Sequence, residues 1–146
     1  KLVIRSSVLA VACANPNYPR QGKLDFVKVG NYGGFSGLHV SLQIYENGRM
    51  EYYSMLLGDT SSMDIDPIPA EKAKAIIKEF KSHDVLKMEL NQSGNMNYYI
   101  ELQKGRRRNY VQWGDMYEGK ISHVLYELYE ETFGLIPQDV NDQGEI

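Results

Sequence analysis

A glycine-rich segment is the first feature of this sequence with the residue types for ligand binding. Gly30, Gly33, Gly34 and Gly37 lie within eight residues, and the backbone N–H groups of such a segment could hold a phosphate. Phosphate loops of the dinucleotide and Walker types lead from a strand into a helix, whereas a strand-like alternation follows here. We therefore interpret the glycines as residues that permit tight backbone geometry, and we expect no bound nucleotide.

Three aspartates form a second candidate cluster. Asp59, Asp64 and Asp66 carry carboxylates, which are the hard oxygen ligands that calcium prefers. Their spacing lacks the glycine and the terminal glutamate of an EF-hand loop. We expect Gly58–Ile68 to be a solvated polar loop without a metal ion.

The histidines and the single cysteine show no catalytic spacing. His39, His83 and His123 are scattered, and neither an HExxH nor a Ser-His-Asp pattern joins them. A thiol nucleophile needs an activating neighbour, and Cys13 lies in an apolar stretch without one. One cysteine also excludes a disulfide framework and a cysteine-based zinc site. The expectation is a protein that is not an enzyme and holds neither cofactor nor metal.

A basic cluster, Lys104 with Arg106–Arg108, lies beside Tyr110 and could contact phosphates. The whole chain has 16 Lys and Arg against 19 Asp and Glu, so its net charge of −3 provides no extended basic face. We interpret the cluster as a solvated hairpin tip and expect no nucleic-acid partner. The sequence contains no run of 18 or more apolar residues, so no transmembrane segment is predicted.

The amino-terminal residues bear on the cellular compartment. Val8–Cys13 is similar to the end of a bacterial lipoprotein signal, in which small residues precede a lipid-bearing cysteine, although Arg5–Ser7 interrupts the apolar region. Two interpretations remain open: lipid attachment at Cys13, or a strand or short helix that docks on the domain. The chain begins with Lys1, so we expect it to start inside a longer product. Both the cell envelope, lipid-anchored or periplasmic, and the cytoplasm remain possible locations.

The 146 residues suffice for one globular domain. We expect an amino-terminal segment and linker at 1–23, with Pro16 and Pro19 in the linker, a single domain at 24–137 and a polar, mobile tail at 138–146.

Alternation of apolar and polar residues predicts the strands, most clearly from Leu38 to Tyr45. Asn47-Gly48 is typical of a two-residue type I′ turn, which would oppose Glu46 to Arg49 and turn Tyr53 and Met55 inward. The predicted strands are Leu24–Val29, Leu38–Tyr45, Arg49–Met55, Tyr98–Leu102 and Arg107–Trp113.

Two amphipathic helices complete the pattern. Pro69 begins the first, and Gly134 ends the second. Their apolar stripes are Ala73, Ile76, Ile77 and Phe80, and Ile121, Val124, Leu125, Leu128 and Thr132. The order β-β-β-α-β-β-α predicts a two-layer α+β fold with a mostly antiparallel sheet of about five strands and both helices on one face. The expected core is Leu38, Val40, Leu42, Ile44, Ile76, Ile77, Phe80, Ile100, Val111, Leu125 and Leu128.

From Phe26 to Gly134 the chain resembles emfourin, a small inhibitor encoded with protealysin-like metalloproteases. The resemblance rests on Gly33-Gly34-Phe35-x-Gly37 before a strand and on the order of elements, including Ala73-x-x-Ile76-Ile77. The chain is also similar to small lipoproteins of Bacteroidetes-type bacteria, through the same glycine motif, Gly94-Asn95-Met96 and Trp113-Gly114-Asp115. It departs from emfourin in its first 24 residues, the Asn47-Gly48 hairpin and the segment 58–68.

The first resemblance implies a protein that blocks the active-site cleft of a thermolysin-like metalloprotease with its glycine loop, Gly33, Gly34, Phe35 and Gly37. The second implies an envelope protein with a structural or ligand-binding role. Phe35 would be the apolar anchor if its ring points outward and a core residue if it lies under the first hairpin. The sequence leaves this choice, like the oligomeric state, open.

Overall fold

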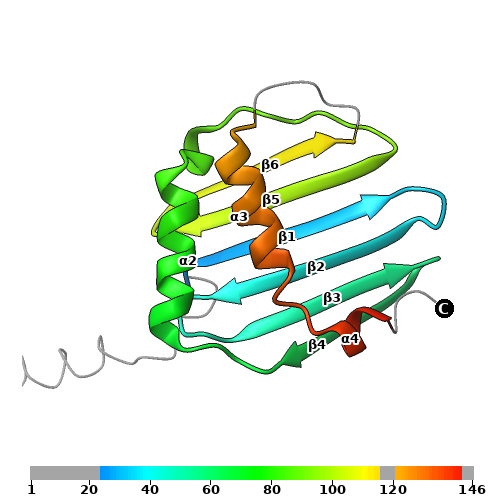
Figure 1. Cartoon of the computed structure of the whole chain (residues 1–146), viewed down its shortest axis with the longest axis horizontal. Coiled ribbons are helices and arrows are strands. Elements are labelled where there is room, and N and C mark those ends of the chain that lie inside the picture. Colours follow the sequence, from blue (N-terminus) through cyan, green and yellow to red (C-terminus); the bar gives the residue numbers. More distant parts are fainter. Residues whose placement is uncertain (1–23, 116–120, 143–146) are drawn as a thin grey trace, which may run out of the picture.

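Six antiparallel strands form one sheet in the order β4-β3-β2-β1-β5-β6 (Figure 1). The structure, a computed structural model, describes residues 24–115 and 121–142. The strands are β1 Phe26–Gly33, β2 Leu38–Tyr45, β3 Met50–Leu56, β4 Asp59–Ile65, β5 Met96–Lys104 and β6 Arg107–Gly114. The two-layer α+β prediction is confirmed, but the number of strands is six and not about five.

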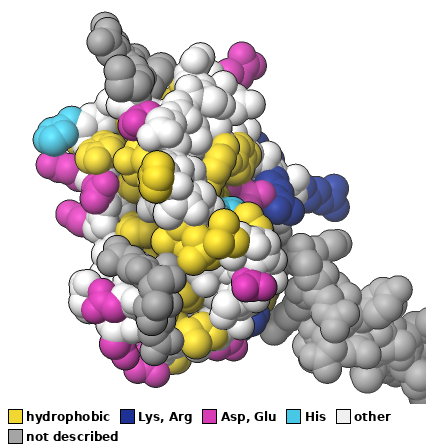
Figure 2. Space-filling view, turned by 90° about the vertical axis from the view of Figure 1, so that its right-hand side faces the viewer, with side chains coloured by type: hydrophobic (Ala, Val, Ile, Leu, Met, Phe, Trp, Pro, Cys, Tyr) yellow, Lys and Arg dark blue, Asp and Glu magenta, His cyan; other side chains and the backbone are white. Residues whose placement is uncertain are grey.

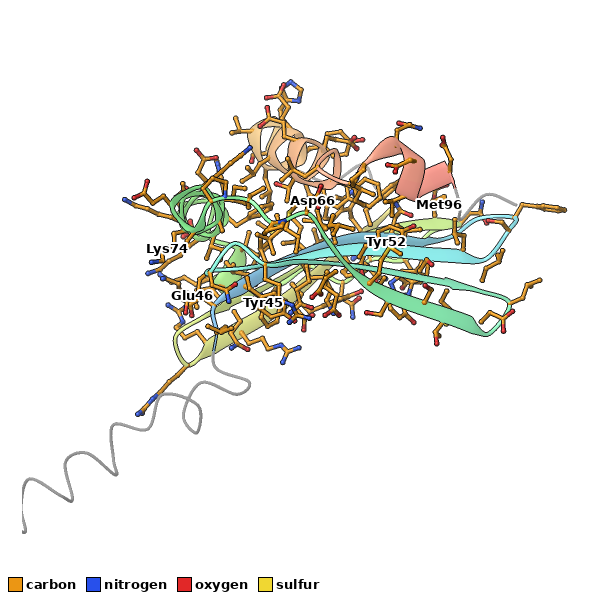
Figure 3. All side chains as sticks on the ribbon, turned by 90° about the horizontal axis from the view of Figure 1, so that it is seen from below. Tyr45, Glu46, Tyr52, Asp66, Lys74 and Met96 are labelled. Carbon is orange, nitrogen blue, oxygen red and sulfur yellow. The ribbon has the colours of Figure 1, made fainter. Side chains whose placement is uncertain are left out.

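The helices lie on one face of this sheet, as Figures 1 and 3 show. Between β4 and β5 lie α2 Ala70–Ser82 and the short 3-10 helix η1 Val85–Lys87, and after β6 follow α3 His123–Phe133 and α4 Gln138–Asp142. α2 starts directly after Pro69, as predicted. α4 forms at the start of the segment that we expected to be a mobile tail.

The core lies between the helices and the sheet. Its sheet side comes from alternate residues of the central strands, such as Val27, Leu42 and Ile100, each of which is completely buried. The predicted core is confirmed, except that Leu38 and Ile76 are only partly buried and pack against its margin. Burial of one apolar face of each element is what joins the two layers.

α3 begins at a capping serine that the sequence pattern did not reveal. The Ser122 hydroxyl accepts a hydrogen bond from the Leu125 N–H at 3.2 Å, which satisfies one of the free donors of the first turn. The helix turns Leu125, Leu128 and Tyr129 toward the sheet, whereas Val124 is mostly exposed. The prediction of Val124 in the buried stripe was wrong, because the helix faces the sheet with the side of Tyr129, which contacts Gly30 of β1 and Tyr98 of β5.

The β2–β3 hairpin has a register one residue away from the predicted one. Tyr45 and Arg49 flank a three-residue loop, with hydrogen bonds from Tyr45 N–H to Arg49 O and from Gly48 N–H to Tyr45 O, each 2.9 Å. Gly48 takes a φ of +92°, which is typical of a turn followed by a bulge residue. The slip exchanges the two faces of β3, so Tyr52 is buried in the core and Tyr53 lies on the opposite face.

β4 replaces the polar loop predicted at Gly58–Ile68. Leu57 and Gly58 both have positive φ and join β3 to β4 in a two-residue turn. Side chains hold the added strand, since the Arg49 guanidinium lies 2.9 Å from the Asp64 carboxylate and the Ser62 hydroxyl donates to Glu51 at 3.2 Å. Six of its seven residues are exposed, so no apolar alternation marks it as a strand.

Replacement of Ile77 by Ala should destabilise the fold, because Ile77 is 1% exposed within the face of α2 that packs on the sheet. We expect the free energy of unfolding to fall by about 2–5 kcal/mol in urea denaturation. Val124→Ala removes methyl groups from an exposed site and serves as the control, with a change below about 0.5 kcal/mol. Equal effects of the two substitutions would contradict this packing.

Candidate functional site

The loop between β1 and β2 is shaped by glycines. Gly33, Gly34 and Gly37 have φ angles of +107°, +70° and +67°, which side chains other than glycine rarely allow. The Gly34 N–H donates to the Asn95 carbonyl at 2.8 Å, and a Cβ at Gly33 would collide with the same oxygen. β1 itself continues to Gly33, beyond its predicted end at Val29. This close contact with the start of β5 fixes the position of the loop.

Phe35 is the exposed tip of this loop. Its ring is fully exposed, which decides the question left open by the sequence in favour of an outward position. Leu57, at the β3–β4 turn, is 91% exposed. The pairing of His39 with Met55 places the β1–β2 loop and the β3–β4 turn side by side at one end of the sheet. We call Phe35 and Leu57 the loop-end pair.

Figure 2 views the molecule from this end and shows hydrophobic side chains gathered across it, with acidic side chains around them. Neither side chain of the loop-end pair is covered by the described part of the chain. Exposed apolar side chains that are held on preformed turns can enter pockets of a partner protein. Sequence reasoning missed Leu57, because a leucine beside a glycine carries no signal that it lies at the tip of a hairpin.

The sheet face away from the helices carries a cluster of aromatic rings, which we call the open-face rings. Neighbouring ring centroids lie 5.2–6.3 Å apart, within the usual range of aromatic contacts. Each ring comes from a different strand: Tyr53 from β3, His39 from β2, Tyr32 from β1, Tyr99 from β5 and Tyr110 from β6. Figure 3 shows side chains, and no helix of the described ranges, on this side of the sheet.

Gly30 lies beneath the centre of the open-face rings. A Cβ at this position would lie 2.6 Å from Cζ and Oη of Tyr99 and 2.7 Å from the Val40 carbonyl oxygen. On the opposite face, the Tyr129 hydroxyl donates to the Gly30 carbonyl at 2.9 Å. The absence of a side chain at Gly30 therefore allows Tyr99 to pack flat on the sheet.

Gln112 orients two of the outer rings. The hydroxyls of Tyr32 and Tyr110 both donate to its Oε1 at 2.8 Å. Its Nε2 donates to Ser93 Oγ at 3.2 Å and to the Gln92 carbonyl at 3.3 Å. Gln112 is 5% exposed, so these bonds satisfy a buried amide as well as ordering the rings.

His39 and Tyr99 form a hydrogen-bonded pair, with 2.7 Å between Nε2 and Oη. Burial raises the pKa of Tyr99 far above its usual range, and burial together with the positive charge of Lys28 lowers the pKa of His39. At neutral pH the tyrosine keeps its proton and the imidazole is uncharged. The bond between His39 and Tyr99 therefore joins two uncharged groups.

A hollow of about 200 Å³ opens beside this pair, on the same face of the sheet. We call it the open-face hollow. Lys28, Gln43 and Glu51 are directly opposite one another on β1, β2 and β3, and they form one side of it. Its complete lining is Lys28, His39, Ser41, Gln43, Glu51, Tyr53 and Tyr99.

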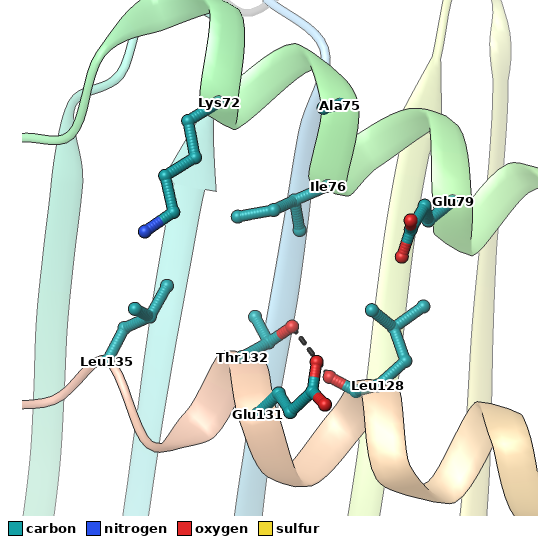
Figure 4. A pocket seen from close by; sticks show the side chains of 8 residues that line it. All are labelled: Lys72, Ala75, Ile76, Glu79, Leu128, Glu131, Thr132 and Leu135. Carbon is teal, nitrogen blue, oxygen red and sulfur yellow. Dashed lines mark hydrogen bonds between the residues drawn. The ribbon is translucent and has the colours of Figure 1, made fainter.

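A second depression, of about 260 Å³, lies between α2 and α3 (Figure 4). Ile76 and Leu128 give it an apolar surface, and Lys72 and Glu79 lie along its α2 side. The Thr132 hydroxyl donates to the Leu128 carbonyl at 2.7 Å, so its proton is already used within the helix. This groove offers apolar contact and few directed polar groups.

The other predicted candidates lie apart from one another. No three His, Cys, Asp or Glu side chains are grouped for metal binding within residues 24–115 and 121–142. Asp59 and Asp64 are on β4, His83 caps the end of α2, and the His123 Nε2 lies 3.0 Å from Glu127.

The basic cluster divides along the β5–β6 hairpin. All three arginines are exposed, but Arg108 lies 2.6 Å from Glu101 and its guanidinium lies over the ring of Phe26 at 5.3 Å. Cys13, the proposed lipid site, lies outside the described residues.

The low pKa of His39 should make stability depend on pH. Below about pH 6.5 the imidazole of the unfolded chain binds a proton before that of the folded chain, so the free energy of unfolding should fall as the pH decreases. Urea denaturation at pH values on either side of 6.5 measures this loss. In His39→Gln the loss should be smaller, and an unchanged loss would show that other groups cause it.

No protein-family model matches the chain, and no curated protein matches its sequence. Within the described part of the chain, no helix is long and apolar enough to cross a membrane.

Proposed function

We propose that the chain is a non-catalytic binding protein that docks a protein partner on the loop-end pair. The observation that carries this proposal is the full exposure of Phe35 on a loop fixed by the bond from Gly34 to Asn95. A large aromatic side chain that is exposed in the free protein gains the most from burial in a partner's pocket.

The backbone of the loop supports rapid and specific docking. Gly33 and Gly34 adopt the positive φ angles that this loop requires. The hydrogen bond from the Gly34 N–H to the Asn95 carbonyl ties the loop to the residue before β5. A loop that is already ordered loses little conformational entropy on binding, so more of the burial energy appears as affinity. Leu57 supplies a second apolar contact on the neighbouring turn.

The partner that we propose is a thermolysin-like metalloprotease, in line with the resemblance to emfourin. The loop end would enter the active-site cleft with Phe35 as its anchor and exclude substrate by occupying the cleft. The exposed residues of the loop are Phe35, Ser36 and Gly37, and the Ser36 hydroxyl oxygen accepts a hydrogen bond from the Leu38 N–H within the loop, so the apolar ring of Phe35 is the largest group available for occlusion.

A cell-envelope protein with a ligand-binding role is the second candidate. The open-face hollow favours it, because a polar and aromatic depression on a rigid sheet face is suited to small ligands. Lipid attachment at Cys13 would belong to this candidate.

Phe35→Ala should abolish most of the inhibition of a thermolysin-like protease. We expect the wild-type chain to inhibit peptide cleavage and the variant to have an inhibition constant at least about tenfold higher, since the lost anchor is an aromatic hot spot. The midpoint of urea denaturation should be unchanged, because the ring packs on nothing. Val124→Ala, which shortens an exposed side chain on α3, is the control and should inhibit as the wild type does.

Leu57→Asn tests the second anchor, since asparagine tolerates the positive φ of Leu57. We expect a smaller increase in the inhibition constant than for Phe35→Ala. A wild-type chain that inhibits no thermolysin-like protease would refute the proposed partner. Full inhibition by both variants would refute the proposed contact surface.

A further inference from the structure

The open-face hollow is built into the sheet and does not depend on loops. Ser41 is 2% exposed at the centre of β2, and its strand neighbours are Gly30 and Tyr53. The short Ser41 side chain leaves a depression, and the longer side chains around it form its walls. The lining residues come from β1, β2, β3 and β5, so backbone hydrogen bonds fix their spacing.

The charged side chains of the hollow already have partners of opposite charge. The Lys28 Nζ lies 3.8 Å from a Glu101 carboxylate oxygen, and the Arg49 guanidinium lies 2.8 Å from that of Glu51. An anion or a cation entering the hollow would meet a charge of its own sign as well as an opposite one. A ligand without net charge avoids this repulsion.

Free hydrogen-bonding groups line the same hollow. Among the described residues, the Gln43 amide and the Tyr53 hydroxyl form no intramolecular hydrogen bond. The 3.8 Å separation of Lys28 from Glu101 exceeds hydrogen-bond length, so the ammonium group also has donors available. Together these side chains present both donors and acceptors, which matches a ligand whose hydroxyl groups do both.

Aromatic rings provide the apolar part of the wall. The rings of Tyr53 and His39 pack edge to face, with centroids 5.2 Å apart and planes at 73°. The C–H groups on one side of a sugar ring can pack against such surfaces, while its hydroxyls point outward. The volume of about 200 Å³ is below the roughly 300–1,000 Å³ of sites for drug-sized ligands, so it suits one ring.

We propose that the open-face hollow binds one sugar ring of a neutral carbohydrate. Gln43 and Tyr53 exchange hydrogen bonds with ring hydroxyls, and Lys28 donates to a third. The uncharged His39–Tyr99 pair forms the aromatic wall beside them. This site is separate from the loop-end pair, so it stands whether or not the chain inhibits a protease.

Titration of the ¹⁵N-labelled chain with glucose, galactose, mannose, N-acetylglucosamine and uridine tests the proposal by amide chemical shifts. At least one sugar should give saturable shifts that centre on Lys28, Ser41 and Gln43. Saturation by uridine alone would show a nucleobase site and overturn the proposal. The absence of saturable shifts with all four sugars, or shifts confined to the loop end, would also overturn it.

Substitutions then locate the contacts. Gln43→Ala should weaken binding of the responsive sugar about fivefold, the effect of one hydrogen bond, and Tyr53→Ala at least about tenfold. Tyr126→Ala is the matched control, because Tyr126 is an exposed tyrosine on α3, in the helix layer and outside the hollow, and it should change affinity less than about twofold. If the amide spectrum of Tyr53→Ala lacks the dispersion of a folded protein, the affinity of Gln43→Ala alone tests the proposed contacts. Unchanged affinity in Gln43→Ala, or equal weakening by Tyr126→Ala, would refute the proposed contacts.

Discussion

Gly30 is the point at which both faces of the sheet approach the same backbone. The Tyr99 ring lies against it on the open face, and the Tyr129 hydroxyl donates to its carbonyl from α3. A Cβ would displace Tyr99, and with it the hydrogen bond to His39. Tyr129 also packs edge to face on Trp113 of β6 with ring centroids 5.2 Å apart, so one side chain places α3 against both the central strand β1 and the edge strand β6. The position of the helix layer and the shape of the open face thus share one constraint, a residue without a side chain.

Most of the elements could be predicted from the sequence, because an element that is buried on one face has apolar residues at regular intervals. β2 alternates over its whole length, and Ile77 and Leu128 follow helical spacing, so these elements and most of the core could be assigned. The helices had to cover one face of the sheet, since their apolar stripes can be buried nowhere else. The glycine loop was also found, because Gly33 and Gly34 are required by backbone geometry.

The remaining features of the fold depend on interactions that produce no regular spacing of apolar residues in the sequence. β4 carries almost no buried side chain, and its pairing rests on backbone bonds and on Arg49, whose partner Asp64 is 15 residues away. The loop that contains Gly48 has three residues and not two. The one additional loop residue shifts the register and so exchanges the two faces of β3. Tyr53 was therefore assigned to the core, and the open-face hollow could not be seen in the sequence. Whether Phe35 points outward is likewise a property of the folded loop.

The two candidate surfaces differ in the physical basis of recognition. At the loop end, exposed Phe35 and Leu57 offer apolar area on turns, and binding there would be driven by removal of that area from water. On the open face, hydrogen-bonded strands hold polar groups at fixed separations, and binding would depend on matching donors and acceptors.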